Sequence, residues 1–410
     1  MLKKPVPVVL VAGYLGAGKT TLLNRILRNQ EGYKIAVIVN DVGEVNIDAE
    51  LIAQNGMVRG QADNIVALTN GCICCSMKDS FVTQVAALIL SEQYDYIVIE
   101  ASGISEPSSI VSAISQLDGT VPDSPYPNIA RLDNIVSVVD ARRLADDYAC
   151  GEKLMEFKQN SMMPAEKKPE NIMGLIIRQI EFCSTIILNK VSAVTEDEKE
   201  KLLEIIHNLQ TEAVVIEADY ADVPMEEILD TGRYDLEKIR QSMGWIQLYQ
   251  DKSIPMMRGG MRKRTASAKK AVSYAGVDKT TSVPGYEKRK GPLGIESFVY
   301  CRREPFDKVK LQQWLKNDFP SNLIRMKGIV WFQQEPYFTQ VLEQAGSLIE
   351  LEIAGIWTAA EWEPGDPLTS EEEEIWDEKY GDRINKLVFI GYDLDREKIE
   401  QQLDGCLGEF

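Results

Sequence analysis

The stretch VPVVLVAGYLGAGKT, residues 6–20, decides the fold of this chain. Residues 6–12 form a short apolar run rich in valine, which is typical of a strand buried on both faces. Residues 13–20 match the phosphate-binding loop G-x-x-x-x-G-K-[ST] at every defined position. Residues 20–29, TTLLNRILRN, carry apolar side chains at helical spacing. Strand, glycine-rich loop and helix in this order predict a phosphate site formed by backbone N–H groups and a helix N-terminus.

The side chains of this loop have separate roles in the predicted site. Lys19 is expected to reach the β- and γ-phosphates and to act in catalysis, and the Thr20 hydroxyl is expected to bind Mg²⁺. The glycines let the backbone wrap a phosphate. The loop residues predicted to bind nucleotide are Gly13, Gly16, Ala17, Gly18, Lys19 and Thr20. Together they predict a nucleoside triphosphate hydrolase.

Further apolar runs continue the pattern of buried strands as far as about residue 240. They lie at residues 35–40, 64–70, 94–100, 133–140, 184–190 and 213–218. Helical periodicity separates several of them, as in residues 80–90 and in EDEKEKLLEIIHNL, residues 196–209. Strands that alternate with helices predict an α/β fold with a doubly wound, mainly parallel sheet, here of the P-loop NTPase type.

Two acidic residues follow predicted strands. YIVIE ends at Glu100, which is predicted to hold Mg²⁺ through a water molecule or to orient the attacking water; an ordinary acid at a strand end is the alternative. Gly103 lets the backbone approach the γ-phosphate. Asp41 stands in VNDVGE, a polar segment with the character of a nucleotide-sensing switch loop. We expect Glu100 and Asp41 to act in catalysis together with Lys19.

The sequence NKVS, residues 189–192, bears on the choice of base. Many GTPases read guanine with N-K-x-D, in which the aspartate accepts hydrogen bonds from N1–H and the exocyclic amine. Here Asn189 and Lys190 match, but Ser192 stands at the aspartate position, and a hydroxyl cannot supply the same charge-assisted pair. Either guanine selectivity is weaker, with ATP as an alternative to GTP, or another acceptor such as Glu196 or Asp197 contributes.

A cluster of three cysteines follows the predicted strand at 64–70, in NGCICCS. Cys72, Cys74 and Cys75 offer soft thiolate donors, which favour Zn²⁺ or Cu(I). Three sulfurs are too few for a closed tetrahedral zinc site, so we expect a further ligand, for which the carboxylate of Glu44 on the predicted switch loop is the candidate. The alternative is a set of buried thiols or a redox pair. The other cysteines, Cys150, Cys183, Cys301 and Cys406, are scattered singly and are expected to pack in the interior.

Composition excludes several classes of protein. The 410 residues are 44% hydrophobic and 26% charged, with a net charge of −18, which argues against a general nucleic-acid binder. Apolar runs long enough to span a bilayer are absent from the sequence, which predicts no membrane role. Seven cysteines, three of them clustered, do not form a disulfide framework. The predicted location is the cytoplasm.

The second half of the chain changes character. We predict a nucleotide-binding domain at 1–240, a flexible basic linker at 241–294 and a smaller α+β domain at 295–410. The acidic stretch 361–382 is interpreted as a solvated loop.

At this point the chain resembles a known family. GYLGAGKTTLLN, GCICC and IVIEASG together resemble the CobW-type branch of the CobW/HypB/UreG GTPases, and SFVYCRREPFD, RMKGIVWF and GDRINKLVFIG are similar to the C-terminal domain of that branch. The resemblance implies a slow, Mg²⁺-dependent GTPase that binds zinc or a similar transition metal and delivers it to a client protein. It adds Thr21 to the phosphate-loop residues and assigns Asn189 and Lys190 to the base.

Two departures from the family pattern and two alternatives remain. Ser192 replaces the usual aspartate, and the histidine-rich stretch of many members is absent, so neither the base nor the metal is fixed. An activator of a metalloenzyme, in which nucleotide gates binding, is one alternative. A factor in the assembly of a metalloenzyme or of cobalamin is the other. The client and any homo-oligomer are left open.

Overall fold

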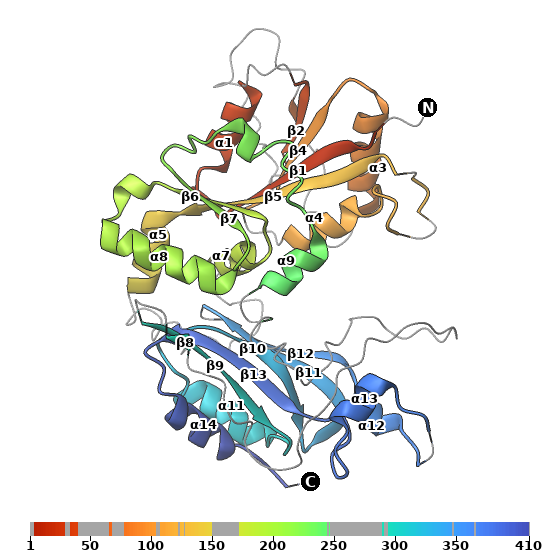
Figure 1. Ribbon diagram of the computed structural model, residues 1–410, viewed down its shortest axis with the longest axis vertical. Coiled ribbons are helices and arrows are strands. Elements are labelled where there is room, and N and C mark those ends of the chain that lie inside the picture. The colour runs from red at the N-terminus through yellow and green to blue at the C-terminus, as the bar shows by residue number, and fades with distance from the viewer. Residues whose placement is uncertain are drawn as a thin grey trace. The chain divides into compact units, whose positions relative to one another are not determined.

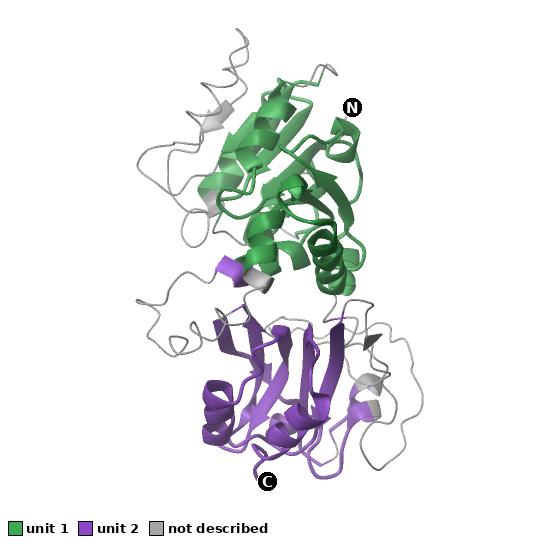
Figure 2. Ribbon diagram, turned by 90° about the vertical axis from the view of Figure 1, so that its left-hand side faces the viewer, with its two compact units in different colours: residues 1–149, 175–243 green, residues 150–174, 244–410 purple. Residues whose placement is uncertain are grey.

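The computed structural model describes residues 4–28, 33–39, 65–67, 78–103, 107–121, 124–126, 128–149, 172–243, 246, 289–290, 294–346, 348–364 and 366–409. The chain forms two compact units, shown in Figure 2. Unit 1 comprises residues 1–149 and 175–243, and unit 2 comprises residues 150–174 and 244–410. The expected linker at 241–294 lies mostly outside the described residues, so the predicted domain boundaries stay predictions.

Unit 1 is built on a seven-stranded sheet in which every paired strand runs parallel to its neighbour (Figure 1). Its strands are β1 (Val6–Ala12), β2 (Ile35–Val39), β3 (Ile65–Ala67), β4 (Tyr96–Glu100), β5 (Ala130–Asp140), β6 (Thr185–Asn189) and β7 (Val214–Ala218). Their order is β3-β2-β4-β1-β5-β6-β7, so β2, β3 and β4 lie on one side of β1 and β5, β6 and β7 on the other. Ligands of such sheets bind at the carboxyl ends of the strands, near this switch point.

Helices cover both faces of this sheet (Figure 1). They are α1 (Lys19–Leu27), α3 (Lys78–Leu90), α4 (Pro107–Ile114), α5 (Ala141–Ala149), α7 (Ile172–Glu181), α8 (Glu196–Leu209) and α9 (Leu236–Ser242). Val9 and Val11 of β1 belong to the core cluster that contains Leu22 of α1. Val8 and Leu10 point to the other face, because side chains alternate along a strand, and they are fully buried as well. The predicted doubly wound fold is confirmed.

Unit 2 contains a six-stranded antiparallel sheet in the order β12-β11-β10-β13-β9-β8. Its strands are β8 (Arg289–Lys290), β9 (Ile295–Arg302), β10 (Leu323–Phe332), β11 (Glu335–Ala345), β12 (Leu348–Ile356) and β13 (Asn385–Tyr392). Helices α11 (Lys308–Asn317) and α14 (Arg396–Asp404) lie together on one face of it (Figure 1). Their Trp314 and Leu403 join Phe298 and Phe389 of the sheet in one core. The predicted α+β class is confirmed for this unit.

Two elements of unit 2 differ from the sequence interpretation. Strand β11 was not predicted, because polar residues such as Thr339, Gln340 and Gln344 interrupt its apolar pattern. These three side chains are nevertheless buried between β10 and β12. The acidic stretch interpreted as a loop contains one short helix, α13 (Ser370–Ile375), and begins at the last residue of another, α12 (Thr358–Glu361). A capping box between Thr369 and Glu372 starts α13.

No helix in the described part of the chain is both long enough and apolar enough to cross a membrane.

Candidate nucleotide-binding site

The phosphate loop connects β1 to α1 through three glycines with positive φ. The φ angles of Gly13, Gly16 and Gly18 are 143°, 77° and 116°, which L-residues rarely adopt. A Cβ on Gly13 would lie 2.4 Å from the carbonyl oxygen of Val138 on β5. A Cβ on Gly18 would lie 2.4 Å from Nδ2 of Asn189 on β6. Gly13 and Gly18 are therefore required both for the turn and for the close approach of neighbouring strands.

Lys19 begins α1 and turns its ammonium group back toward the loop. Its Nζ lies 3.5 Å from the carbonyl oxygen of Tyr14 and 4.0 Å from Oε1 of Glu100. Lys19 and Glu100 are only 7% and 2% exposed. Strands β1 and β4 are paired neighbours, with Val11 opposite Glu100, so the sheet register sets this juxtaposition. The structure thus brings together two of the three predicted catalytic residues.

The backbone after β4 also contacts the loop. A Cβ on Gly103 would lie 2.8 Å from the side chain of Leu15, so this position favours glycine. Nε2 of Gln179 on α7 donates to the carbonyl oxygen of Gly103 at 3.4 Å. Among the remaining predicted loop residues, Thr20 is half-buried and Thr21 is exposed.

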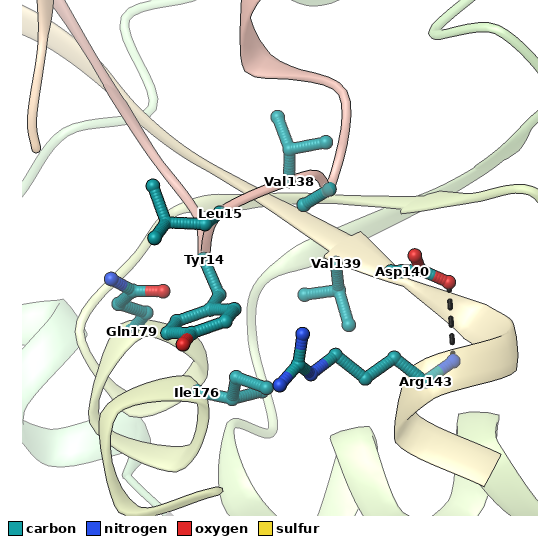
Figure 3. Close-up of a pocket in the computed structure, with 9 residues that line it drawn as sticks. Tyr14, Leu15, Val138, Val139, Asp140, Arg143, Ile176 and Gln179 are labelled. Atoms are coloured by element: carbon teal, nitrogen blue, oxygen red, sulfur yellow. Dashed lines mark hydrogen bonds between the residues drawn. The ribbon is translucent and has the colours of Figure 1, made fainter. Parts of the chain in front are cut away.

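A small pocket lies against the loop and was not predicted from the sequence (Figure 3). The Arg143 guanidinium carbon lies 4.4 Å from the centroid of the Tyr14 ring, a cation–π contact. Arg143 stands in the first turn of α5, and its backbone N–H donates to Oδ1 of Asp140 at 3.1 Å. Val138, Val139 and Ile176 supply the apolar wall. A basic residue in the first helical turn after a buried strand was the signal for this contact.

Asn189 links the phosphate loop to the far edge of the sheet. Its Nδ2 donates to the carbonyl oxygen of Ala17 at 2.8 Å, and its Oδ1 accepts from the N–H of Ala221 at 2.9 Å. Asn189 is 2% exposed, so both hydrogen bonds are shielded from water. The next residue, Lys190, has φ 63° and forms an ion pair with Oδ2 of Asp140 at 2.6 Å.

Ser192 faces a carboxylate that the sequence analysis did not consider. Its hydroxyl and its backbone N–H donate to Oδ1 of Asp219, at 2.8 and 3.1 Å. Asp219 directly follows β7, and an acid after an apolar strand was the available signal. The two acceptors suggested by the sequence, Glu196 and Asp197, lie in the first turn of α8 instead. Glu196 forms an ion pair with Lys199 at 2.9 Å.

The predicted metal ligands and the switch residue lie outside the described residues. They are Asp41, Glu44, Cys72, Cys74 and Cys75, and they remain predictions. Within the ranges that the structure describes, no group of three or more Cys, His, Asp or Glu is placed to hold a metal ion.

The other described cysteines are poor ligands. Cys183 and Cys406 are buried, as expected, and Cys301 is partly buried. Desolvation raises the pKa of all three thiols, which disfavours the thiolate form that binds metal. Cys150 lies outside the described residues.

A buried lysine in a glycine loop at the switch point of a parallel sheet defines a P-loop nucleotide-binding protein. Residues 7–217 match the family model described as CobW/HypB/UreG, nucleotide-binding domain. Residues 295–407 match the cobalamin synthesis protein cobW C-terminal domain. The chain therefore belongs to the CobW/HypB/UreG family.

Known proteins are similar to nearly the whole of this chain. The chain is 31% identical to the zinc-regulated GTPase metalloprotein activator 1 of Dictyostelium discoideum, over 98% of this chain and 79% of that protein. It is 26% identical to the zinc chaperone YjiA of Escherichia coli K12, over 98% of each. The crystal structure of zinc-bound YjiA GTPase from E. coli aligns with 99% of this chain and 100% of that chain, at 20% identity and a TM-score of 0.40.

Proposed function

We propose that this protein is a slow GTPase that binds zinc or a similar transition metal at Cys72, Cys74 and Cys75 and delivers it to a client metalloprotein. The observation that carries the proposal is the buried contact between the phosphate-loop lysine and the acid that ends β4. Both similar proteins named above carry zinc in their names, as an activator and as a chaperone. The nucleotide is the energy source in this proposal, and the metal ion is the cargo.

The residues around Lys19 fit a magnesium nucleotide. Hydroxyl and carboxylate oxygens are the donors that Mg²⁺ prefers, and Thr20 and Glu100 supply one of each beside the loop. These two residues would hold the ion, which when bound neutralises charge on the β- and γ-phosphates. Lys19 binds the phosphates, and the backbone N–H groups of the loop orient them.

The cargo site would be coupled to the nucleotide through the segment that follows β2. Asp41 and Glu44 stand three residues apart there, so a shift of Asp41 on loss of the γ-phosphate moves Glu44 with it. Loss of one carboxylate ligand weakens the hold on the metal and favours its transfer. The relative named as a metalloprotein activator supports a second candidate, in which the same switch remodels the client.

Zinc titration of the full chain tests the proposal. We expect the zinc affinity, measured by competition with a chelator, to differ roughly 10-fold between the GDP-bound protein and the protein bound to a non-hydrolysable GTP analogue, a typical coupling. By linkage, zinc must change nucleotide affinity by the same factor. A chain in which each ligand is indifferent to the other would contradict metal delivery by this mechanism.

Matched variants locate the cargo site. Replacing Cys72, Cys74 and Cys75 by serine is expected to abolish high-affinity zinc binding, because hydroxyl oxygens are hard and weak ligands. Cys301→Ser is the control, since no described group of three or more metal-binding side chains includes Cys301. Glu44→Ala is expected to remove the difference between the two nucleotide states. Unchanged zinc affinity in the triple variant would place the metal elsewhere.

A further inference from the structure

We propose that Asp219 supplies the carboxylate that selects guanine, in place of the aspartate missing at position 192. This inference rests on the proposed binding of GTP and names the residue that gives it specificity. Ser192 acts as its positioning residue, through the two hydrogen bonds to Oδ1. In this arrangement the loop after β7, instead of the loop after β6, supplies the carboxylate, and the Ser192 hydroxyl lies beside it.

The chemistry of the base sets what this site must provide. Guanine presents two adjacent donors, N1–H and the amine at C2, and needs two acceptors side by side. No hydrogen bond to Oδ2 of Asp219 is found among the described residues, so this oxygen is available to N1–H. The Ser192 hydroxyl donates its proton to Asp219, and its lone pairs can accept from the amine. Adenine presents an acceptor at N1, which a carboxylate repels.

The sheet places this pair beside the nucleotide. Strands β6 and β7 are parallel neighbours with Asn189 opposite Ala218, so the residues that follow them emerge at the same edge. The phosphate loop lies at the same edge, because it follows β1, which is two positions from β6 in the order β1-β5-β6-β7. Asn189 contacts the loop at Ala17 and the β7 turn at Ala221, which sets the distance from phosphates to carboxylate.

The turn that follows Asp219 is held from several sides. Tyr220 and Ala221 have φ 55° and 51°, a left-handed conformation that costs energy in two successive non-glycine residues. Nε of Arg25 on α1 donates to the carbonyl oxygen of Tyr220 at 3.0 Å, and its Nη1 contacts Oδ1 of Asp222 at 2.5 Å. With the Asn189 contact to Ala221, these interactions maintain the strained turn. Such local strain is typical of binding sites.

Three nearby carboxylates are already engaged in ion pairs. Asp140 uses Oδ2 in the ion pair with Lys190 and Oδ1 to accept from Arg143 N–H. Asp222 pairs with Arg25 on the other side of the turn. Glu196 is paired with Lys199 in α8. Of these acids, Asp219 is the one held by the residue that replaces the expected aspartate.

The test is a change of base preference in the full-length chain. GDP, ADP and xanthosine diphosphate are titrated by calorimetry into the unaltered protein and into Asp219→Asn. The unaltered protein should prefer GDP. The variant should lose roughly 10- to 100-fold in GDP affinity, the effect of losing a hydrogen bond to a charged group. It should also gain affinity for xanthosine diphosphate. The oxygen of the new amide accepts from N1–H, and its Nδ2 donates to the Ser192 oxygen, which releases the Ser192 hydroxyl proton to the C2 carbonyl that replaces the amine of guanine.

Control variants distinguish a residue that selects the base from residues that only hold the site in place. Glu217→Gln makes the same charge change two residues before Asp219, but Glu217 faces Lys199 at 3.0 Å, so the base preference of this variant should match that of the unaltered protein. Ser192→Ala should weaken GDP binding less than Asp219→Asn and keep the guanine preference.

Three outcomes are decisive against one claim or the other. An unaltered protein that binds none of the three nucleotides overturns the proposed GTPase function itself. One that binds GDP and ADP equally overturns the inference and leaves nucleotide binding intact. Loss of GDP affinity in Asp219→Asn without gain of xanthosine diphosphate also overturns the inference, since it assigns Asp219 a structural role only.

Discussion

The two ends of the nucleotide site are held by different means. At the phosphate end, backbone conformation dominates, with three glycines at positive φ and the buried pair Lys19 and Glu100. At the proposed base end, side chains that follow neighbouring strands contact one another, as in the pair Ser192 and Asp219, and the groups are partly open to water. We therefore expect substitutions at the phosphate end to change the affinity for every nucleotide alike. Substitutions at the base end should affect the choice among nucleotides.

Among these substitutions, Gly18→Ala should have the largest effect on nucleotide affinity. The new Cβ meets Nδ2 of Asn189 at 2.4 Å, and the backbone must keep φ 116°. Strain together with a disturbed hydrogen bond amounts to about 3 kcal/mol, so affinity for GDP and ADP should each fall roughly 100-fold. Gly16→Ala is the matched control, because it has the turn strain but no neighbour within 4 Å. A loss confined to GDP would break the proposed division between the ends.

Asn189→Ala should have an intermediate effect that reaches both ends. It leaves the Ala17 carbonyl and the Ala221 N–H without their buried partner, which should lower the free energy of unfolding by about 1–3 kcal/mol. The ratio of GDP to ADP affinity should fall as well, because the β7 turn loses its link to the loop. Urea denaturation and calorimetry measure the two effects. Asn189→Asp, which keeps the acceptor for Ala221, should retain more of the selectivity.

The smallest effect concerns unit 2 and should leave the nucleotide site unaffected. Asp307 caps α11 and accepts from the N–H groups of Lys310 and Val309, at 3.0 and 2.9 Å. These hydrogen bonds, chiefly the one from Lys310, hold the pKa of the carboxyl below its ordinary value. A depressed pKa stabilises the fold above the unfolded pKa of about 3.9, and the stabilisation is lost as the pH falls through the folded pKa.

The substitution Asp307→Asn preserves a cap but not the charge. Thermal melts of the variant should therefore depend less on pH between about 5 and 2 than those of the unaltered protein, with similar melting near neutral pH. GDP affinity should stay the same, since Asp307 lies in the other compact unit. An altered GDP affinity would show that the cap of α11 influences unit 1.

Local patterns were sufficient for much of unit 1. Buried parallel strands are continuous apolar runs, so β1, β4 and β6 could be recognised one at a time. Strand β11 shows where this fails, because its polar residues become buried only when β10 and β12 pair with it on both sides. For the site, the phosphate loop could be predicted whole, since its residues are contiguous. The Arg143 contact with Tyr14 could not, because it joins separate elements.

The amino-acid sequence alone determined the phosphate loop, the class of the fold and the family, because these depend on short motifs and on periodicity. Only the tertiary structure decided which carboxylate stands beside Ser192. Residues 192 and 219 are 27 positions apart and follow different strands, so their contact depends on the pairing and register of β6 and β7. Register is set by the packing of the whole sheet, which a stretch of sequence read by itself does not contain.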